Sequence, residues 1–325
     1  MGEFDLIARY FTRPARRAAL GVGDDCALWA ALAPGMQLAV SSDMLVEGRH
    51  FFAGTDARRL GHKALAVNLS DLAACGARPL AFTLALALPQ MDTTWLEGFS
   101  GGLLALADAH DCELIGGDTT QGPLNICITV MGEVPAGQAL LRSGAQPGDG
   151  IYVSGTLGDA RLALEALQGR VHLSPDILAA AQQRLEAPTP RTALGQALCG
   201  IATSALDVSD GLLGDLGHIL RASGVGACID TAITSKLIAT SAYPIRARGR
   251  LESEFIRQCT LAGGDDYELA FTAAPTAHAA VLAAAHASAT PVARIGTIEA
   301  TPGLRLIDED GQPLAQRYAS FDHFA

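Results

Sequence analysis

The chain has 325 residues, of which 49% are hydrophobic and 18% are charged, and its formal net charge is −11. The length favours two domains, and the composition is that of a globular chain with an ample core. The excess of acids disfavours a nucleic-acid partner, which would need a basic surface for its phosphates. The apolar runs are too short to cross a bilayer, and the N-terminus lacks the basic and apolar segments of a signal peptide. We therefore expect a cytoplasmic protein with no membrane partner.

Seven cysteines are scattered along the chain, and no two of them form a CxxC pair. A disulfide framework or a structural zinc site would need paired cysteines at short spacings. We interpret the cysteines as small buried residues in a reducing compartment.

The first acids lie near the N-terminus. Residues 3–11 have the apolar spacing of a helix, and residues 21–27 (GVGDDCA) place Asp24 and Asp25 on a turn punctuated by glycine. A similar arrangement follows at residues 36–43.

Residues 36–41 (MQLAVS) predict a short strand that ends at Ser42 and Asp43. His50 follows in the segment EGRHFF. A single histidine is more often a hydrogen-bonded structural residue than a ligand, so His50 alone is a weak signal.

A helix is predicted over residues 58–77, with an apolar stripe through Leu60, Ala64 and Val67. The next position on that stripe is Asp71. A carboxylate facing the core is costly unless it is paired, protonated or bound to a cation. The alternative is that the helix frays before Asp71 and the side chain reaches water.

The segment LIGGDTTQG at residues 114–122 is an apolar run that stops at Gly116 and Gly117 and is followed by Asp118. Glycine tolerates turns and close backbone approach, so the pattern predicts a strand with Asp118 at its end. An ordinary turn is the alternative for one such stretch, because Gly and Asp are common turn residues.

The remaining elements of the first half alternate between strand and helix, which predicts an α/β domain. They are a strand at 79–88, a helix at 94–110 and a strand at 125–134. Residues 135–150 are rich in Gly and Pro without periodicity, so we expect an N-terminal domain over 1–136 and a C-terminal α/β domain over 137–325.

The second half begins with a predicted strand and glycine turn at 151–158 and a helix at 159–167, a pattern that indicates either a phosphate loop or plain packing. Residues 205–220 place Asp207, Ser209 and Asp210 in the first turn of a helix or just before it. One acid there is a favourable cap, but two acids flanking a serine exceed what a cap requires.

A second Gly-Gly-Asp motif follows in LAGGDDYEL (261–269), where Asp265 and Asp266 come directly after the glycines. A helix near 276–287 and strands near 292–298 and 304–307 complete the chain.

Six acidic clusters thus lie at the ends of apolar runs or at helix starts, positions that converge on one side of an α/β sheet. They are Asp24/Asp25, Asp43, Asp71, Asp118, Asp207/Asp210 and Asp265/Asp266. The chain has only two lysines, so divalent cations must neutralise these acids, and Mg²⁺ is usually held by carboxylates together with substrate phosphates. The pattern indicates phosphoryl chemistry.

The sequence lacks a GxxxxGK[ST] loop, a kinase HRD loop, a GxSxG elbow and an HExxH motif. An enzyme that joins two phosphates would not need a general base, because the attacking phosphate oxygen is already anionic. We therefore expect no catalytic side chain, with positioning and charge neutralisation by Mg²⁺ carrying the reaction.

Eight motifs resemble, in order and spacing, those of the thiamine-monophosphate kinase family, and the resemblance runs from about residue 3 to residue 324. They are GVGDDCA, SSDMLVEGRHF, AVNLSDLAACGARP, LIGGDTTQG, LLRSGAQPGD, LDVSDGLLGDLGHI, GGDDYEL and the terminal FDHF. The family belongs to an ATP-binding superfamily that includes aminoimidazole ribonucleotide synthetase and selenophosphate synthetase.

The resemblance implies an aminoimidazole ribonucleotide synthetase-like fold of two α/β (α+β) domains. The N-terminal sheet would pair with its twin into a barrel in a homodimer, and the C-terminal domain would close over the nucleotide. It also implies that ATP gives its γ-phosphoryl group directly to thiamine monophosphate, yielding thiamine diphosphate and ADP.

The resemblance also assigns site residues by motif match. Those that correspond to Mg²⁺ ligands are Asp25, Ser41, Ser42, Asp43, Asp71, Asp118, Asp207 and Asp210. Those that correspond to ATP contacts are Gly117, Asp118, Arg142 and Ser209. Those in the thiamine monophosphate site are His50, Asp265 and Phe321. The family usually has Glu where this chain has Asp265, and often STD where it has Ser41, Ser42 and Asp43.

Two alternatives remain open. One is a sibling ligase or dikinase of the same superfamily. Selenophosphate synthetase uses a reactive Cys or Sec near its N-terminus, whereas the first cysteine here is Cys26 inside GDDCA, which counts against that sibling. The other is a non-catalytic Mg-nucleotide-binding protein, which the retention of nearly all the acids disfavours.

Overall fold

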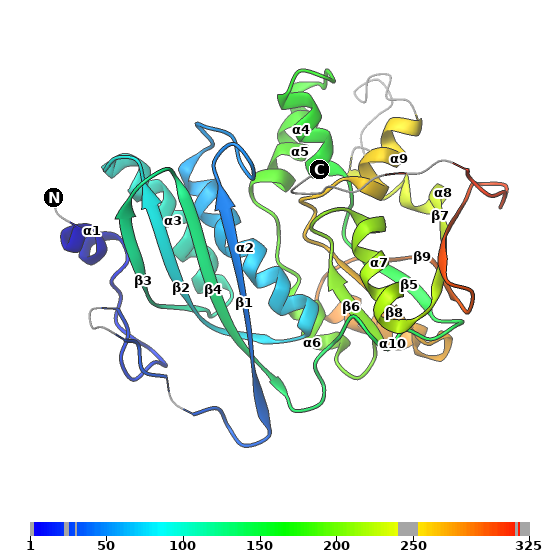
Figure 1. Cartoon of the computed structure of the whole chain (residues 1–325), viewed down its shortest axis with the longest axis horizontal. Coiled ribbons are helices and arrows are strands. Elements are labelled where there is room, and N and C mark those ends of the chain that lie inside the picture. The colour runs from blue at the N-terminus through cyan, green and yellow to red at the C-terminus, as the bar shows by residue number, and fades with distance from the viewer. Residues whose placement is uncertain (1–2, 23–25, 30, 240–252, 316–317, 319–325) are drawn as a thin grey trace. The chain divides into compact units, whose positions relative to one another are not determined.

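A computed structural model describes residues 3–22, 26–29, 31–239, 253–315 and 318. The chain divides into two compact units (Figure 1). Unit 1 comprises Met1–Leu72 and Ala77–Ala139, and unit 2 comprises Ala73–Gly76 and Leu140–Ala325.

Unit 1 contains one four-stranded sheet in the order β1-β4-β2-β3. Its elements are α1 (Glu3–Tyr10), β1 (Met36–Val46), α2 (Ala57–Cys75), β2 (Arg78–Leu88), α3 (Thr93–Ala109), β3 (Glu113–Gln121) and β4 (Asn125–Pro135). β4 pairs antiparallel with β1 and β2, and β2 pairs parallel with β3. Helices α2 and α3 lie against one face of this sheet (Figure 1).

The two faces of the unit 1 sheet differ sharply. Strand β4 alternates between buried and half-buried residues, and its buried Ile128 and Val130 lie on the helix-covered face. On the other, open face of β1, Leu38, Val40 and Met44 are 53%, 57% and 51% exposed. A row of exposed large apolar side chains on one face is typical of a surface that another molecule covers.

Unit 2 contains a six-stranded sheet in the order β10-β7-β9-β5-β8-β6. Its strands are β5 (Gly150–Ser154), β6 (Ser204–Asp207), β7 (Gly226–Asp230), β8 (Leu269–Ala273), β9 (Val292–Glu299) and β10 (Gly303–Ile307). Its helices are α4 (Asp159–Leu167), α5 (Pro175–Glu186), α6 (Thr192–Leu198), α7 (Leu212–Ser223), α8 (Thr231–Thr234), α9 (Ser253–Ala262), η2 (Pro275–Ala277) and α10 (His278–Ala287).

Both faces of β5 are buried, because helices cover the sheet on each side. Ile151 and Val153 join a core that includes Leu216 of α7. Tyr152, which points the other way, joins a core with Leu198 of α6 and Val281 of α10. This three-layer packing explains why β5 reads as a continuous apolar run with no alternation.

Two predictions about strand ends were wrong. Ser42 and Asp43 lie inside β1, because β1 pairs with β4 along its whole length to Val46. Asp118 lies inside β3, because the ladder with β2 continues past the glycines to Gln121. The suggested fraying before Asp71 is also wrong, since α2 continues to Cys75.

Candidate functional site

The acids of unit 1 form a close pair between β1 and α2. Ser41 Oγ donates a hydrogen bond to Asp71 Oδ2. The backbone N–H of Asp43 donates to Asn68 Oδ1 at 3.1 Å, and the Asn68 amide donates to the carbonyl of Ala64 at 3.0 Å, which ties the strand to the helix. Burial, and secondly the charge of Asp71, raise the pKa of the Asp43 carboxyl to about 6.

This pair has the properties of a cation site. Two neighbouring carboxylates in a partly buried place repel each other and are stabilised by a positive charge between them. Their donors are carboxylate and hydroxyl oxygens, the ligands that Mg²⁺ prefers. The residues present therefore fit a magnesium ion.

Ser42 and Asp118 face the opposite side of the sheet. The Ser42 hydroxyl contacts Thr129 Oγ1 at 3.0 Å and donates to the Ile128 carbonyl at 3.1 Å, on the open face. Asp118 is exposed and is paired with Ala85, on the same open face but at the far edge of the sheet. The expectation that the acids converge on one side of a sheet is therefore wrong for unit 1.

The glycine before Asp118 has a structural reason. Gly117 has a φ of 149°, and a Cβ at this position would lie 1.8 Å from the carbonyl oxygen of Leu84 on β2. Only glycine lets the two strands approach so closely. Gly117 and Asp118 line a small cavity of about 40 Å³ together with Phe11 of the N-terminal segment.

His50 is held within unit 1 by hydrogen bonds to Val46 and Lys63. The backbone N–H of Val46 donates to His50 Nδ1 at 3.0 Å, so a neutral His50 carries its proton on Nε2. The ammonium of Lys63, which is only 2% exposed, donates to the His50 carbonyl at 3.3 Å. In this neutral form His50 is a hydrogen-bond donor at Nε2.

In unit 2 the predicted residues gather between β6 and α7. Asp207 ends β6, and the loop that follows carries Ser209 and Asp210. The backbone N–H groups of Ser209, Asp210 and Gly211 all donate to Asp215 Oδ2 at 3.0 Å. Asp215 is 6% exposed and shapes this loop from the first turn of α7.

Burial is the main cause that raises the pKa of Asp215 to about 6. The charge of Asp210 raises it further, while the backbone hydrogen bonds lower it. The carboxylate form is the one that accepts the three N–H groups, so Asp215 is a structural acid of this loop and not one of the predicted ligands.

Arg142 and Asp265 lie near the same loop. Burial, followed by the charges of Arg221 and Arg142, lowers the pKa of His218 on α7, whereas the charge of Asp210 raises it. Arg142 and Asp210 therefore both lie near His218. The backbone N–H of Asp265 donates to the Ser209 carbonyl at 2.8 Å.

Two of the predicted site residues cannot be placed in the structure. Asp25 and Phe321 lie outside the described residues. Among the residues that the structure describes, no group of three His, Cys, Asp or Glu side chains is arranged to hold a metal. Some of the predicted Mg²⁺ ligands belong to unit 1 and others to unit 2. The full set of ligands stays a prediction.

Sequence reasoning missed four of these residues: Asn68, Lys63, Asp215 and Glu268, which belongs to a buried ion cluster described below. Asn68 and Lys63 act through contacts between a helix and a distant segment, which no local pattern reveals. Asp215 carried a usable signal, because it is an acid in the first turn of an otherwise apolar helix stripe.

Within the described ranges, no helix is long and apolar enough to span a membrane.

Comparison with known proteins gives a consistent result over both units. Residues 23–134 match the family AIR synthase related protein, N-terminal domain, and residues 146–309 match AIR synthase related protein, C-terminal domain. The chain is 46% identical over 330 residues to a thiamine-monophosphate kinase of Salmonella typhimurium, which spans 100% of this chain and 98% of that protein.

Two solved structures are similar over nearly the whole chain. A thiamine-monophosphate kinase from Stenotrophomonas maltophilia K279a is 45% identical, with a TM-score of 0.83 and 96% of each chain covered. AaThiL complexed with AMPPCP and TMP is 28% identical, with a TM-score of 0.74, covering 90% of this chain and 89% of that one.

Proposed function

Because the chain belongs to the thiamine-monophosphate kinase family, we propose that it transfers the γ-phosphoryl group of ATP to thiamine monophosphate, giving thiamine diphosphate and ADP. The observation that carries this proposal is the 46% identity over the full chain to a kinase of that name. A similar kinase solved with AMPPCP and TMP supports both substrates.

We propose that several Mg²⁺ ions are held by the residues that the motifs assign. These are Asp25, Ser41, Ser42, Asp43, Asp71, Asp118, Asp207 and Asp210. When bound, Mg²⁺ neutralises the charge of the phosphates and of the carboxylates around them. The raised pKa of Asp43 beside Asp71 supports this role, because the pair is unfavourable without a cation.

The other residues bind and orient the two substrates. Gly117, Asp118, Arg142 and Ser209 are proposed to contact ATP, with Ser209 set in place by the loop that Asp215 organises. We propose that His50 donates its Nε2–H to a phosphate oxygen of thiamine monophosphate, because its Nδ1 accepts the N–H of Val46. Asp265 and Phe321 are proposed to contact the same substrate.

The transfer itself is proposed to be direct and in line. The attacking oxygen belongs to a phosphate and is already anionic, so no side chain needs to remove a proton from it. The chain's own residues align the acceptor with the γ-phosphate and exclude water, and alignment of this kind supplies much of the rate enhancement in phosphoryl transfer.

We further propose that the chain acts as a homodimer joined through the open face of the unit 1 sheet. Leu38, Val40 and Met44 on that face are exposed in the single chain and would be buried by a twin sheet. Asp118 and Asp43 lie on strands at opposite edges, three strand spacings or roughly 14 Å apart. A dimer that brings β3 of one protomer near β1 of its partner would place Asp118 beside Ser42 of the partner subunit, because both side chains lie on the open face.

The experiment is a product assay. Purified protein is incubated with ATP, Mg²⁺ and thiamine monophosphate, and thiamine diphosphate is measured by chromatography. Other phosphorylated acceptors run in parallel distinguish a sibling enzyme. Absence of thiamine diphosphate at micromolar enzyme would refute the proposed function, and calorimetric ATP binding without turnover of any acceptor would indicate a non-catalytic binding protein.

A further inference from the structure

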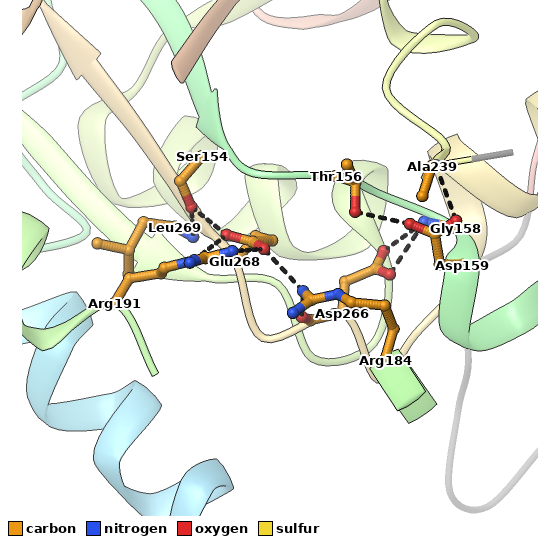
Figure 2. A network of polar contacts seen from close by, with 10 residues as sticks. All are labelled: Ser154, Thr156, Gly158, Asp159, Arg184, Arg191, Ala239, Asp266, Glu268 and Leu269. Atoms are coloured by element: carbon orange, nitrogen blue, oxygen red, sulfur yellow. Dashed lines mark hydrogen bonds and ion pairs between the residues drawn. The ribbon is translucent and has the colours of Figure 1, made fainter. Parts of the chain in front are cut away.

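Unit 2 contains a buried ion cluster of Glu268, Arg184 and Arg191 next to the loop that carries Asp265. Glu268, which has 0% exposure, follows this loop and precedes β8. Its carboxylate receives Arg184 from α5 and Arg191 from the start of α6, and each arginine side chain is only 16% exposed. Figure 2 shows the guanidinium groups of Arg184 and Arg191 both meeting the Glu268 carboxylate.

Each carboxylate oxygen of Glu268 accepts two hydrogen bonds. Arg191 donates through Nε to Oε2 at 2.7 Å and through Nη2 to Oε1 at 2.5 Å, which is a two-pronged contact. Arg184 Nη2 donates to Oε1 at 2.7 Å. Ser154 Oγ donates to Oε2 and accepts the backbone N–H of Leu269 at 2.8 Å. Breaking such a cluster would leave buried charges unpaired.

The loop in front of this cluster has a strained backbone. Asp265 and Tyr267 have φ values of 66° and 51°, in the left-handed region that non-glycine residues rarely adopt. Each such residue costs about 1–3 kcal/mol and persists only where its surroundings determine it. The Asp265 and Tyr267 N–H groups donate to the carbonyls of Ser209 and Val208, each at 2.8 Å.

The ion cluster fixes the residues on both sides of Tyr267. The same Nη2 of Arg184 that contacts Glu268 donates to the backbone carbonyl of Asp266 at 3.0 Å. The Asp266 carboxylate accepts the N–H of Gly158 at 2.9 and 3.0 Å (Figure 2). Tyr267 is thereby held in its left-handed conformation between two anchored neighbours.

The side chain of Tyr267 connects this anchored segment to Asp265. Its hydroxyl donates to Asp265 Oδ1 at 3.3 Å, so the direction of the Asp265 carboxylate depends on where Tyr267 is held. We propose that Arg184 and Arg191, acting through Glu268 and Tyr267, are positioning residues that aim the Asp265 carboxylate at the acceptor substrate. The proposal rests on the proposed function and deepens it at one end of the site.

The first test is kinetic and uses the full-length protein. Arg191→Met removes the two-pronged contact but leaves Arg184 on Glu268, and Tyr267→Phe removes only the hydroxyl. Both variants should raise the KM for thiamine monophosphate by about tenfold or more, because small misplacements of binding groups are costly. The KM for ATP should change less than about twofold, since Ser209 is also held by the hydrogen bond from its N–H to Asp215, which neither variant removes. An equal rise in both KM values would overturn the proposal.

A double-mutant cycle separates positioning from general destabilisation. If Arg191 acts through Asp265, Arg191→Met should change the KM for thiamine monophosphate by less than about twofold in an Asp265→Ala background. The same large factor in both backgrounds would contradict the proposed path. Arg170→Met is the matched control. Arg170, whose side chain is 53% exposed, makes a comparable two-pronged contact with the buried Glu165, and its loss should leave both KM values unchanged.

A second measurement does not depend on activity. Hydrogen–deuterium exchange at the amides of Asp265 and Tyr267 should rise about tenfold or more in Arg191→Met and stay unchanged in Arg170→Met. If wild-type protein made no thiamine diphosphate but exchange rose as expected, the proposed function would fail while the positioning cluster stood. Unchanged exchange in a folded Arg191→Met would refute the cluster's role, and Arg191→Lys provides the milder variant if Arg191→Met does not fold.

Discussion

Replacing Asp71 by Asn tests whether the acid pair of unit 1 is built for a cation. The pKa of Asp43 is raised from 3.8 to about 6, with burial as the larger cause and the charge of Asp71 as the second. A difference of about 2 pKa units corresponds to about 3 kcal/mol of destabilisation once Asp43 is ionised. Because Asp71 is the smaller cause, Asp71→Asn should recover about 1 kcal/mol of this.

The sign of the effect follows from proton binding. The folded state holds the Asp43 proton more tightly than the unfolded state, so this stabilisation is fully present below pH 4 and is lost as the pH rises through about 6. In EDTA at pH 8, Asp71→Asn should therefore raise the Tm of the metal-free protein by about 2–4 °C. At pH 5 the gain should shrink, because Asp43 is then largely protonated.

The assay is thermal unfolding at both pH values, with and without Mg²⁺ and ATP. Wild-type protein should be stabilised by the ligands and Asp71→Asn much less, since a carboxylate of the proposed site is missing. Ser41→Ala is the control, because it removes the hydrogen bond to Asp71 without removing charge. A lower Tm of Asp71→Asn at pH 8 in EDTA would show that Asp71 has a structural role, and would refute the argument from charge repulsion.

Three further predictions concern other parts of the molecule. Asp118→Asn should abolish product formation yet change the free energy of unfolding by less than about 0.5 kcal/mol, because the side chain is exposed. Mixed with inactive Asp43→Asn, it should regain about a quarter of wild-type activity through heterodimers, whereas no recovery would contradict a site shared between protomers. Gly117→Ala should lower the free energy of unfolding, measured by calorimetry, by about 2–4 kcal/mol, because its Cβ would lie 1.8 Å from a carbonyl oxygen. Gly116→Ala should be nearly neutral in the same measurement, because its Cβ would meet only a methyl group at 3.9 Å. Burial raises the pKa of Asp159 to about 6, so Asp159→Asn should flatten the fall in stability between pH 5 and 8 by up to about 1.5 kcal/mol in urea titrations, and an unchanged slope would argue against this titration.

The sequence predicted most of the regular structure of unit 1, because its helices and strands have clear periods. The expected helix at 58–77 and strand at 79–88 agree with α2 and β2. The expected ends of β1 and β3 were wrong for a physical reason. Polar residues such as Ser42 look like strand ends in sequence, but pairing with β4 continues through them because the open face of the sheet tolerates polar side chains.

The sequence predicted candidate site residues but not how they are arranged. Asp43 and Asp71 are indeed brought together, whereas Asp118 lies on another face and edge, because the face of a strand residue depends on a register that sequence alone does not give. Glu268 and its arginines could not be recognised, because their partners are more than 70 residues apart along the chain.

The most direct test of the proposed reaction follows the phosphoryl group itself. ATP labelled in its γ-phosphate is incubated with the protein, Mg²⁺ and thiamine monophosphate, and both the products and the protein are examined for label. The account predicts thiamine diphosphate labelled in its terminal phosphate, an equal amount of ADP, and unlabelled protein. Label released only as inorganic phosphate, or retained on the protein before transfer, would contradict it.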